Sequence, residues 1–399
     1  MVQRLHRHAA DNGLSGTNLA RAGDYNQRVV LQAIRAHGEL TRGKLAEITG
    51  LTHQSTINIT KRLIAEGMVL DLGRTIGARG QPAMRLTVNP EGAYALGLNL
   101  DRDHMTVVTM DLQGRIRDRI YLDKHFALPN DALDFVKTAL DSGLRRLRIP
   151  RSRLIGVGLA IPDRLGGVDV AERPDGYDQW SRIDVAKVFS AELKIPVYVE
   201  NDATAAAIGE LQFGQGLHHK SFIYTLISAG IGCGLIINSQ PYPGGLTHAG
   251  EIGNIPITPE NGQARTLWNV VSIYALYGEL ARRGIAVTDP DDLVADGGEM
   301  EAGIDAWVTQ AAGHMTAPFL AITYALSPEL HVIGGQLPAF VAEKLCVFLN
   351  RYLDTHEGQI PLTRFTTSTA SVDAAAMGAA VLVFQNRLLP GPNVLKASN

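Results

Sequence analysis

Six polar or basic side chains follow the start of a predicted helix that begins after Thr52. Short and amide side chains come first and cations follow, as in a helix whose start reads base edges and whose flank contacts phosphates. The six candidate DNA contacts are His53, Gln54, Ser55, Asn58, Lys61 and Arg62. The alternative is an ordinary solvated helix face, which carries the same residue types.

A second group of candidate DNA contacts lies in a glycine-rich, dibasic segment at 73–82. Arg79-Gly80-Gln81-Pro82 resembles the Arg-Gly-Arg-Pro core of AT-hook peptides. A guanidinium on such an extended backbone fits the narrow minor groove of A/T-rich DNA. We therefore predict that Arg79, Gly80 and Gln81 contact DNA. Glycine-proline loops without any ligand are common, so this interpretation depends on the flanking elements.

Three predicted helices and a hairpin must position these residues between 24 and 90. Asp24 and Gln27 predict a capping box at the start of the first helix. The helices are expected at 24–38, 41–50 and 52–67, and the strands of the hairpin at 68–70 and 85–88. Helix, glycine-containing turn, helix and hairpin predict a winged helix-turn-helix, preceded by an N-terminal arm at 1–23.

Charge is divided unevenly along the chain. Residues 1–88 hold 12 of the 37 Lys and Arg residues but only 6 of the 40 Asp and Glu residues. That region has a net charge of +6, and the remainder has −9. A basic head on an acidic body indicates that the head meets a polyanion, here double-stranded DNA.

The two cysteines, Cys233 and Cys346, are too few for a disulfide framework and are typical of a reducing compartment. No apolar run approaches the roughly 20 residues that span a bilayer. The first 23 residues lack the apolar centre of a signal peptide. We therefore expect a cytoplasmic protein with no membrane partner.

From residue 91 onward, apolar strands alternate with helices, which predicts an α/β body. Strands are expected at 94–100, 105–111, 116–122, 153–162 and 197–199, and helices at 131–147, 185–193, 203–209, 314–324 and 343–352. Asn201 and Asp202 fall where a strand ends and a helix begins. An amide and a carboxylate suit a polyol, because together they donate and accept hydrogen bonds. The alternative is a helix cap, which Asx residues also favour.

The chain resembles the ROK family, which contains bacterial repressors and sugar kinases built on the actin-like ATPase fold. The head matches the regulator branch in its Arg-Gly-x-Pro-Ala wing and its Asn-Pro linker. The matching blocks of the body are 156–162, 199–203, 228–234, 249–253, 327–335 and 373–379. The resemblance implies a two-lobed sugar-kinase-like sensor at 91–399, with lobe one at about 91–200 plus 372–399 and lobe two at about 201–371.

The resemblance also implies that kinase chemistry is lost. The metal-binding carboxylate and the glycines of the first phosphate loop correspond to Asn99, Asp101 and Arg102, and the Thr of the second loop corresponds to Ala229. Phosphoryl transfer depends on positioning and charge stabilisation, so we expect no catalytic residue, no cofactor and no enzyme activity. The glycines at 228–234 are expected to serve only a tight βα turn. Without cysteines between 254 and 275, the family's zinc site is also lost.

The sugar contacts of the family are better kept. The residues expected to bind a ligand are Asn201, Asp202, Glu251, His248 and Asn254. Asn201, Asp202 and Glu251 match sugar contacts of the family, and Asn254 stands where the family has a His. His248 could replace a lost contact or be an ordinary loop histidine. Trp268, near the place of a further sugar-binding Glu, either stacks on a sugar or belongs to the core.

Together these features predict a transcription regulator, most simply a repressor of carbohydrate-utilisation genes. It would bind a near-palindromic, A/T-rich operator as a homodimer or homotetramer. A sugar or sugar derivative in a cleft between the lobes would change the spacing of the wings, and with it operator affinity in either direction. Two alternatives are an active sugar kinase with a DNA-binding head, and a DNA-binding scaffold whose body senses a protein partner.

Overall fold

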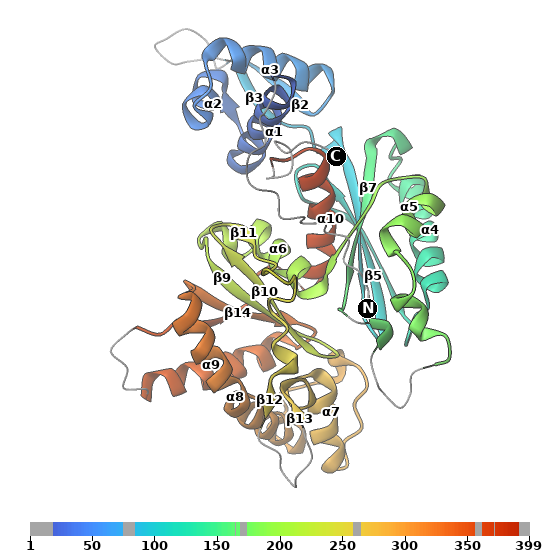
Figure 1. Ribbon diagram of the computed structural model, residues 1–399, viewed down its shortest axis with the longest axis vertical. Helices are drawn as coiled ribbons and strands as arrows, with labels where there is room; N and C mark the ends of the chain where they lie inside the picture. Colours follow the sequence, from blue (N-terminus) through green and yellow to red (C-terminus); the bar gives the residue numbers. More distant parts are fainter. Residues whose placement is uncertain are drawn as a thin grey trace.

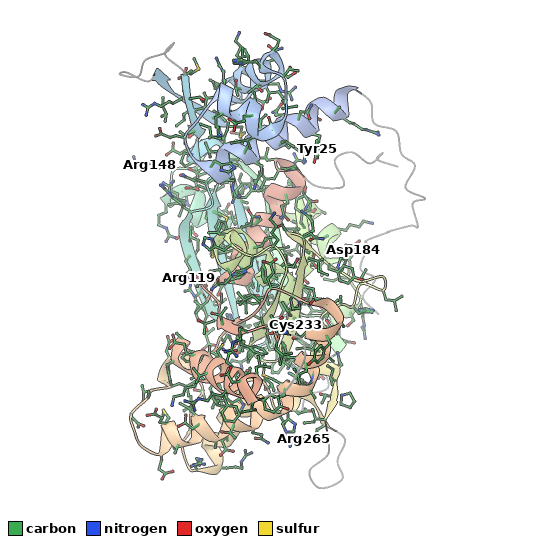
Figure 2. All side chains as sticks on the ribbon, turned by 90° about the vertical axis from the view of Figure 1, so that its left-hand side faces the viewer. Tyr25, Arg119, Arg148, Asp184, Cys233 and Arg265 are labelled. Carbon is green, nitrogen blue, oxygen red and sulfur yellow. The ribbon has the colours of Figure 1, made fainter. Side chains whose placement is uncertain are left out.

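A small N-terminal head and two α/β lobes follow one another along the long axis of the molecule (Figure 1). The computed structural model describes residues 19–74, 84–163, 165–167, 174–257, 265–355, 361–370 and 372–390. In the perpendicular view, Tyr25 lies near the head end and Arg265 near the opposite end (Figure 2). Among the described helices, none combines the length and the apolar character needed to cross a membrane.

The head is a winged helix-turn-helix, which confirms the predicted fold. Its elements are α1 (Leu19–His37), β1 (Leu40–Thr41), α2 (Arg42–Thr49), α3 (His53–Ala65), β2 (Val69–Arg74) and β3 (Met84–Val88). The strands form a sheet in the order β1-β3-β2. Thr41 and Thr52 cap α2 and α3, because each side chain accepts a hydrogen bond from a backbone N–H three residues on. Gly50 makes the left-handed turn between these helices.

The predicted capping box at Asp24 and Gln27 was wrong. Asp24 lies within α1, which already includes Leu19. The two side chains contact α3 instead. Gln27 Nε2–H donates to Glu66 at 2.8 Å, and Asp24 lies 3.8 Å from Arg62. A tertiary contact between helices therefore explains this polar pair. The predicted wing contacts Arg79, Gly80 and Gln81 lie outside the described residues.

Each lobe contains a five-stranded sheet with the same topology, three antiparallel strands followed by two parallel ones. In lobe one the order is β6 (Ile116–Asp123), β5 (His104–Asp111), β4 (Tyr94–Leu100), β7 (Leu154–Ile161) and β8 (Val197–Asn201). In lobe two it is β11 (Gln240–Pro241), β10 (Ile231–Ile237), β9 (Phe222–Ile227), β14 (Leu330–Gly335) and β15 (Phe365–Thr367), and a separate pair is β12 (Pro256–Ile257) with β13 (Arg265–Thr266). This repeated arrangement confirms the two-lobed sugar-kinase-like fold.

The helices cover both sheets (Figure 1). They are α4 (Pro129–Arg146), α5 (Val185–Leu193) and α10 (Ala374–Arg387) with lobe one, and α6 (Asp202–Phe213), α7 (Ile273–Arg282), α8 (Glu299–Leu326) and α9 (Ala339–Thr355) with lobe two. Helix α5 has the predicted ends, whereas α8 and α9 extend well beyond the predicted 314–324 and 343–352.

The glycine-rich segment at 228–234 does not form the predicted βα turn. It joins β9 to β10, which pair antiparallel with Ile227 opposite Ile231. The residues after the turn form a strand that is covered on both faces: Ile231 and Cys233 belong to one buried cluster, and Ile236 belongs to another. The turn therefore closes a β-hairpin, and no helix follows it.

Helices α6 and α10 lie against each other between the two sheets (Figure 1). Helix α6 packs on β9 and β10, and α10 packs on β4 and β7, so their contact joins the lobes. A Cβ atom at Gly378 would lie 1.7 Å from the carbonyl oxygen of Ala205, and one at Gly209 would lie 2.3 Å from that of Ala374. Only glycine permits this approach of one backbone to the other.

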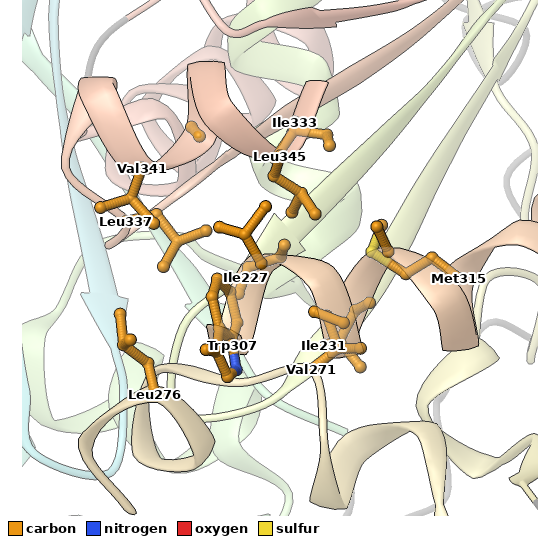
Figure 3. Close-up of a cluster of buried hydrophobic side chains, with 14 of the residues drawn as sticks. Ile227, Ile231, Val271, Leu276, Trp307, Met315, Ile333, Leu337, Val341 and Leu345 are labelled. Carbon is orange, nitrogen blue, oxygen red and sulfur yellow. The ribbon is translucent and has the colours of Figure 1, made fainter. Parts of the chain in front are cut away.

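Buried apolar side chains unite the head with the body. Val30, Ile34 and Leu63 of the head belong to the same cluster as Met110 and Phe384 of the body. A second cluster fills lobe two around Trp307, between β9, α7, α8 and α9 (Figure 3). Since the head shares its core with lobe one, it cannot turn independently of the body without exposing apolar surface.

We expect Gly378→Ala to destabilise the protein by about 2–3 kcal/mol, because the added methyl group must push α6 away from α10. Denaturant unfolding followed by circular dichroism measures the effect. The matched control is Gly313→Ala in α8, where the added Cβ meets nothing within 4 Å. The control should stabilise by about 0.5–1 kcal/mol through helix propensity. Equal effects of the two substitutions would contradict the tight α6–α10 contact.

Candidate functional site

The outer face of α3 presents most of the side chains predicted to contact DNA. The exposed ones are His53, Gln54, Asn58, Lys61 and Arg62. Ser55 is half-buried, and its backbone N–H donates to the side chain of Thr52 at 3.2 Å. The opposite face, with Thr56, Thr60 and Leu63, is buried. Two threonines on the buried face were not predicted, since a hydroxyl is not part of an apolar pattern.

Arg62 is the candidate whose charge is partly compensated within the head. Its guanidinium lies 3.8 Å from Asp24 and 3.9 Å from Glu66. All three side chains are largely exposed, so each pair contributes at most about 1 kcal/mol. A phosphate could therefore replace these carboxylates without a large loss of stability.

The candidate sugar contacts begin at the junction between β8 and α6. Asn201 is the N-cap of α6, and its side-chain oxygen accepts from the N–H of Thr204 at 3.0 Å. One Asp202 oxygen accepts from the N–H of Ala203 at 2.8 Å. Asn201 therefore caps the helix through its side-chain oxygen. Its side-chain nitrogen can still donate a hydrogen bond to a ligand. Both residues are half-buried.

Several carboxylates from different segments surround Asp202. Burial and, next in size, the nearby charge of Asp101 raise the pKa of Asp202 to about 7, with smaller contributions from Asp163 and Glu251. The hydrogen bond from Ala203 opposes this shift. The structure thus places Glu251 near enough to Asp202 for their charges to interact. Asp101 and Asp163 were not predicted as neighbours of Asp202; they lie just beyond the ends of two other strands of the same sheet, β4 and β7.

Glu251 is paired with the residue that replaces the family's His. The side-chain nitrogen of Asn254 donates to Glu251 Oε2 at 3.3 Å. Asn254 itself is exposed, and Glu251 is half-buried. His248 is also exposed. Of the three residues predicted around 248–254, Glu251 and Asn254 therefore form a contacting pair.

The turn between β4 and β5, which corresponds to the first phosphate loop, reaches lobe two. Asp103 accepts from the hydroxyl of Tyr274 at 3.2 Å and contacts His104 Nδ1 at 2.7 Å. The side-chain amide of Gln336 also contacts His104 Nδ1, at 2.9 Å. Burial alone would lower the pKa of His104, but the hydrogen bond to Asp103 and the charge of Asp101 raise it. Side chains thus link the lobes here.

Trp268 connects the two segments that correspond to the phosphate loops of the family's kinases. The guanidinium of Arg102 lies 4.6 Å from the centre of the Trp268 ring, and the indole N–H donates to the carbonyl oxygen of Ala229 at 3.1 Å. Such a cation–π contact contributes about 0.5–2 kcal/mol. Trp268 is half-buried and packs against the core of lobe two, which supports the core interpretation. Arg102 lies over its ring.

Asp101, Asp103 and His104 place side-chain ligand atoms within 4.8 Å of one another. Sequence reasoning did not predict this cluster. Asp103 and His104 hydrogen-bond each other, and Asp103 also accepts a hydrogen bond from Tyr274.

Lobe two contains a cavity of about 440 Å³, which is lined by Arg265, Asn269, Val270, Ala275, Gly278, Arg282 and Gln310. None of the predicted sugar contacts lines this cavity.

Comparison with known proteins places the body in a family. The ROK family model matches residues 95–386. A xylose repressor of Bacillus spizizenii is 31% identical over 240 residues, which cover 58% of this chain and 60% of that repressor. An N-acetylglucosamine repressor of Escherichia coli O6:H1 is 24% identical over 245 residues, 59% of this chain and 58% of that protein. The match thus spans about 60% of the length of these relatives.

A solved structure shows the same fold over nearly the whole chain. A ROK family transcriptional regulator, described as a homologue of the E. coli MLC protein, aligns with a TM-score of 0.69. It is 20% identical, and the alignment covers 91% of this chain and 97% of that one. At 20% identity, this likeness shows that the two chains share a fold.

The raised pKa of Asp202 predicts a pH-dependent stability. An unfolded chain releases this proton near pH 3.8, whereas the folded protein keeps it until about pH 7. Rising pH between these values therefore favours unfolding. Asp202→Asn should raise the free energy of unfolding at pH 8 by at least about 1 kcal/mol, and by nothing below pH 4. Thermal unfolding across this range measures the difference.

Asp184→Asn is the matched control, because it makes the same exchange at the exposed N-cap of α5. A stability difference between wild type and Asp202→Asn that stays constant from pH 4 to pH 8 would show that Asp202 is not held in its protonated form.

Proposed function

The chain belongs to the ROK family, and on that premise we propose that it is a DNA-binding repressor of carbohydrate-utilisation genes. In this proposal a sugar or sugar derivative bound by the kinase-like body changes the affinity of the head for its operator. The observation that carries the proposal is that a DNA-binding head and a ROK body occur in one chain and pack together. A winged helix-turn-helix with an exposed polar reader face shares one apolar core with a ROK body.

The head supplies the DNA contacts in this proposal. We assign direct base contacts to His53, Gln54, Ser55 and Asn58, and phosphate contacts to Lys61 and Arg62, because the first turns of a reader helix enter the major groove. Arg79, Gly80 and Gln81 are proposed to reach the adjacent minor groove of an A/T-rich site. Two reader helices related by a two-fold axis, in a homodimer or homotetramer, would match a near-palindromic operator.

The body supplies the effector site. Asn201, Asp202 and Glu251 provide an amide and two carboxylates, a set that pairs well with sugar hydroxyls. Asn254 would orient Glu251, and the exposed His248 would supply a further contact to the sugar. Two relatives are named for repressors of xylose and of N-acetylglucosamine. These sugars are therefore the first effectors to try.

We further propose that the body does not transfer phosphate. Asn99 stands where the family's kinases have a metal-binding carboxylate. The segment that corresponds to the first phosphate loop carries two additional carboxylates, Asp101 and Asp103. Arg102 and Trp268 occupy the space between the two former phosphate loops. A triphosphate would have to displace this contact and would meet negative charge, whereas phosphoryl transfer requires the opposite electrostatics.

The reader helix can be tested with a duplex selected by the wild-type protein from a random library. Lys61→Ala should weaken binding and lower the slope of log affinity against log salt by about 1, because one phosphate contact is lost. Binding is measured by fluorescence anisotropy at several salt concentrations. The control is Lys187→Ala on α5, an exposed lysine in lobe one. An unchanged slope for Lys61→Ala would remove Lys61 from the interface.

The sugar response can be tested with the same duplex and with D-xylose or N-acetyl-D-glucosamine. One of these should change duplex affinity at least about fivefold. Glu251→Gln and Asp202→Asn should lose most of the response and keep their DNA affinity, whereas Glu343→Gln on the exposed face of α9 should keep both. ATP-dependent phosphorylation of either sugar would contradict the proposed loss of kinase activity. No change in affinity or melting temperature would reject these sugars as effectors.

A further inference from the structure

Arg35 of α1 is a side chain of the head that hydrogen-bonds to both lobes. Its Nε–H donates to the carbonyl oxygen of Leu112, just after β5 in lobe one, at 3.1 Å. Its Nη1–H donates to the side-chain oxygen of Gln212, in the last turn of α6, at 2.9 Å. One rigid guanidinium thus spans the boundary between the lobes from the side of the head.

The surroundings of Arg35 leave little freedom for other arrangements. Its guanidinium lies 5.8 Å from the centre of the Phe213 ring. At Gly114, whose φ is +97°, an added Cβ would lie 2.5 Å from Phe213 and 3.1 Å from Arg35. Burial lowers the pKa of Arg35 to about 10, so the group stays charged at neutral pH. A desolvated charge depends strongly on its hydrogen-bond acceptors.

Helix α6 connects this arginine to the candidate sugar site. The helix starts at Asp202 and ends at Phe213, a length of about 18 Å at 1.5 Å per residue. Near its end, the buried carboxylate of Glu210 accepts from Ser368 Oγ at 2.5 Å and from the N–H of Ala370 at 3.2 Å. Because these bonds and the packing on β9 and β10 fix α6 to lobe two, the helix moves with that lobe.

We propose that Arg35 is the positioning residue through which the angle between the lobes determines the placement of the DNA-reading helix. The inference rests on the proposed function. Hydrogen bonds weaken steeply beyond a few tenths of an ångström, so a rotation that moves Gln212 away from Leu112 breaks one of the two bonds unless α1 moves. Helix α1 shares its buried face with α3, through Ile34 and Leu63, so a shift of α1 carries the reader helix along.

Arg28 offers a matched comparison on the same helix. Its guanidinium donates to the carbonyl oxygens of Asn386 and Leu389, both at 3.3 Å, at and just beyond the end of α10. Helix α10 packs on the sheet of lobe one. Arg28 therefore fastens the head to lobe one without contacting α6. Removing Arg28 loosens the interface by a similar number of hydrogen bonds, but it leaves the link from Arg35 to α6 in place.

The experiment compares wild type with Arg35→Met, Gln212→Ala and Arg28→Met in the full chain. Thermal unfolding first establishes that each variant is folded. Hydrogen exchange of the amides at 202–213 is then measured with and without the selected duplex, since coupling between two sites is reciprocal and DNA must affect α6 if α6 affects DNA. Duplex affinity is measured in parallel with and without D-xylose or N-acetyl-D-glucosamine.

In wild type and in Arg28→Met, the duplex should change exchange rates along α6. In Arg35→Met and Gln212→Ala this change should fall at least about fivefold, while duplex affinity without sugar stays within about threefold of wild type. Any sugar effect on affinity should fall in the same two variants. An undiminished response in Arg35→Met, or an equal loss in Arg28→Met, overturns the proposal. Failure of the wild-type protein to select any duplex would instead reject the proposed function itself, and this inference with it.

Discussion

Helices α6 and α10 approach so closely that a side chain at Gly209 or Gly378 would overlap a carbonyl of the facing helix. The rest of the structure depends on this contact, because α6 is fixed to the sheet of lobe two and α10 to that of lobe one. Any motion of one lobe relative to the other must preserve or slide along it. Since α6 starts at the candidate sugar site and ends beneath the head, the contact places both sites on a common frame.

Carboxylates dominate the region between the lobes, where a kinase would require positive charge or metal. Burial and the charge of Asp101 raise the pKa of Asp202 to about 7. Asp103 accepts a hydrogen bond from the hydroxyl of Tyr274 and contacts Nδ1 of His104. In the function proposed here, this electrostatic arrangement disfavours a nucleotide and favours a neutral, hydroxyl-rich ligand. The same side chains also form the polar link between the lobes. The turn between β4 and β5 thus has a structural role in joining the lobes.

Signals that act over a few residues were predicted well from the sequence. Thr52 caps its helix as expected, and a strand passes into a helix at Asn201 and Asp202 as predicted. Capping and apolar periodicity depend on neighbours along the chain, so local patterns suffice for them. The same reasoning failed for Asp24, whose contacts with α3 no local pattern contains. It failed also for the turn after Ile227, because strand pairing across a sheet decided what followed the glycines.

The amino-acid sequence by itself determined which chemistry the chain retains: a polar and basic reader helix, a polar pair at the start of α6, and no family metal carboxylate at Asn99. The tertiary structure alone decided which side chains meet. It set Asp101 beside Asp202, and it placed Arg35 between two lobes whose contacting residues lie 77 and 177 positions away. Residue identity limits what a site can bind, but sheet register and helix packing decide which distant groups share that site.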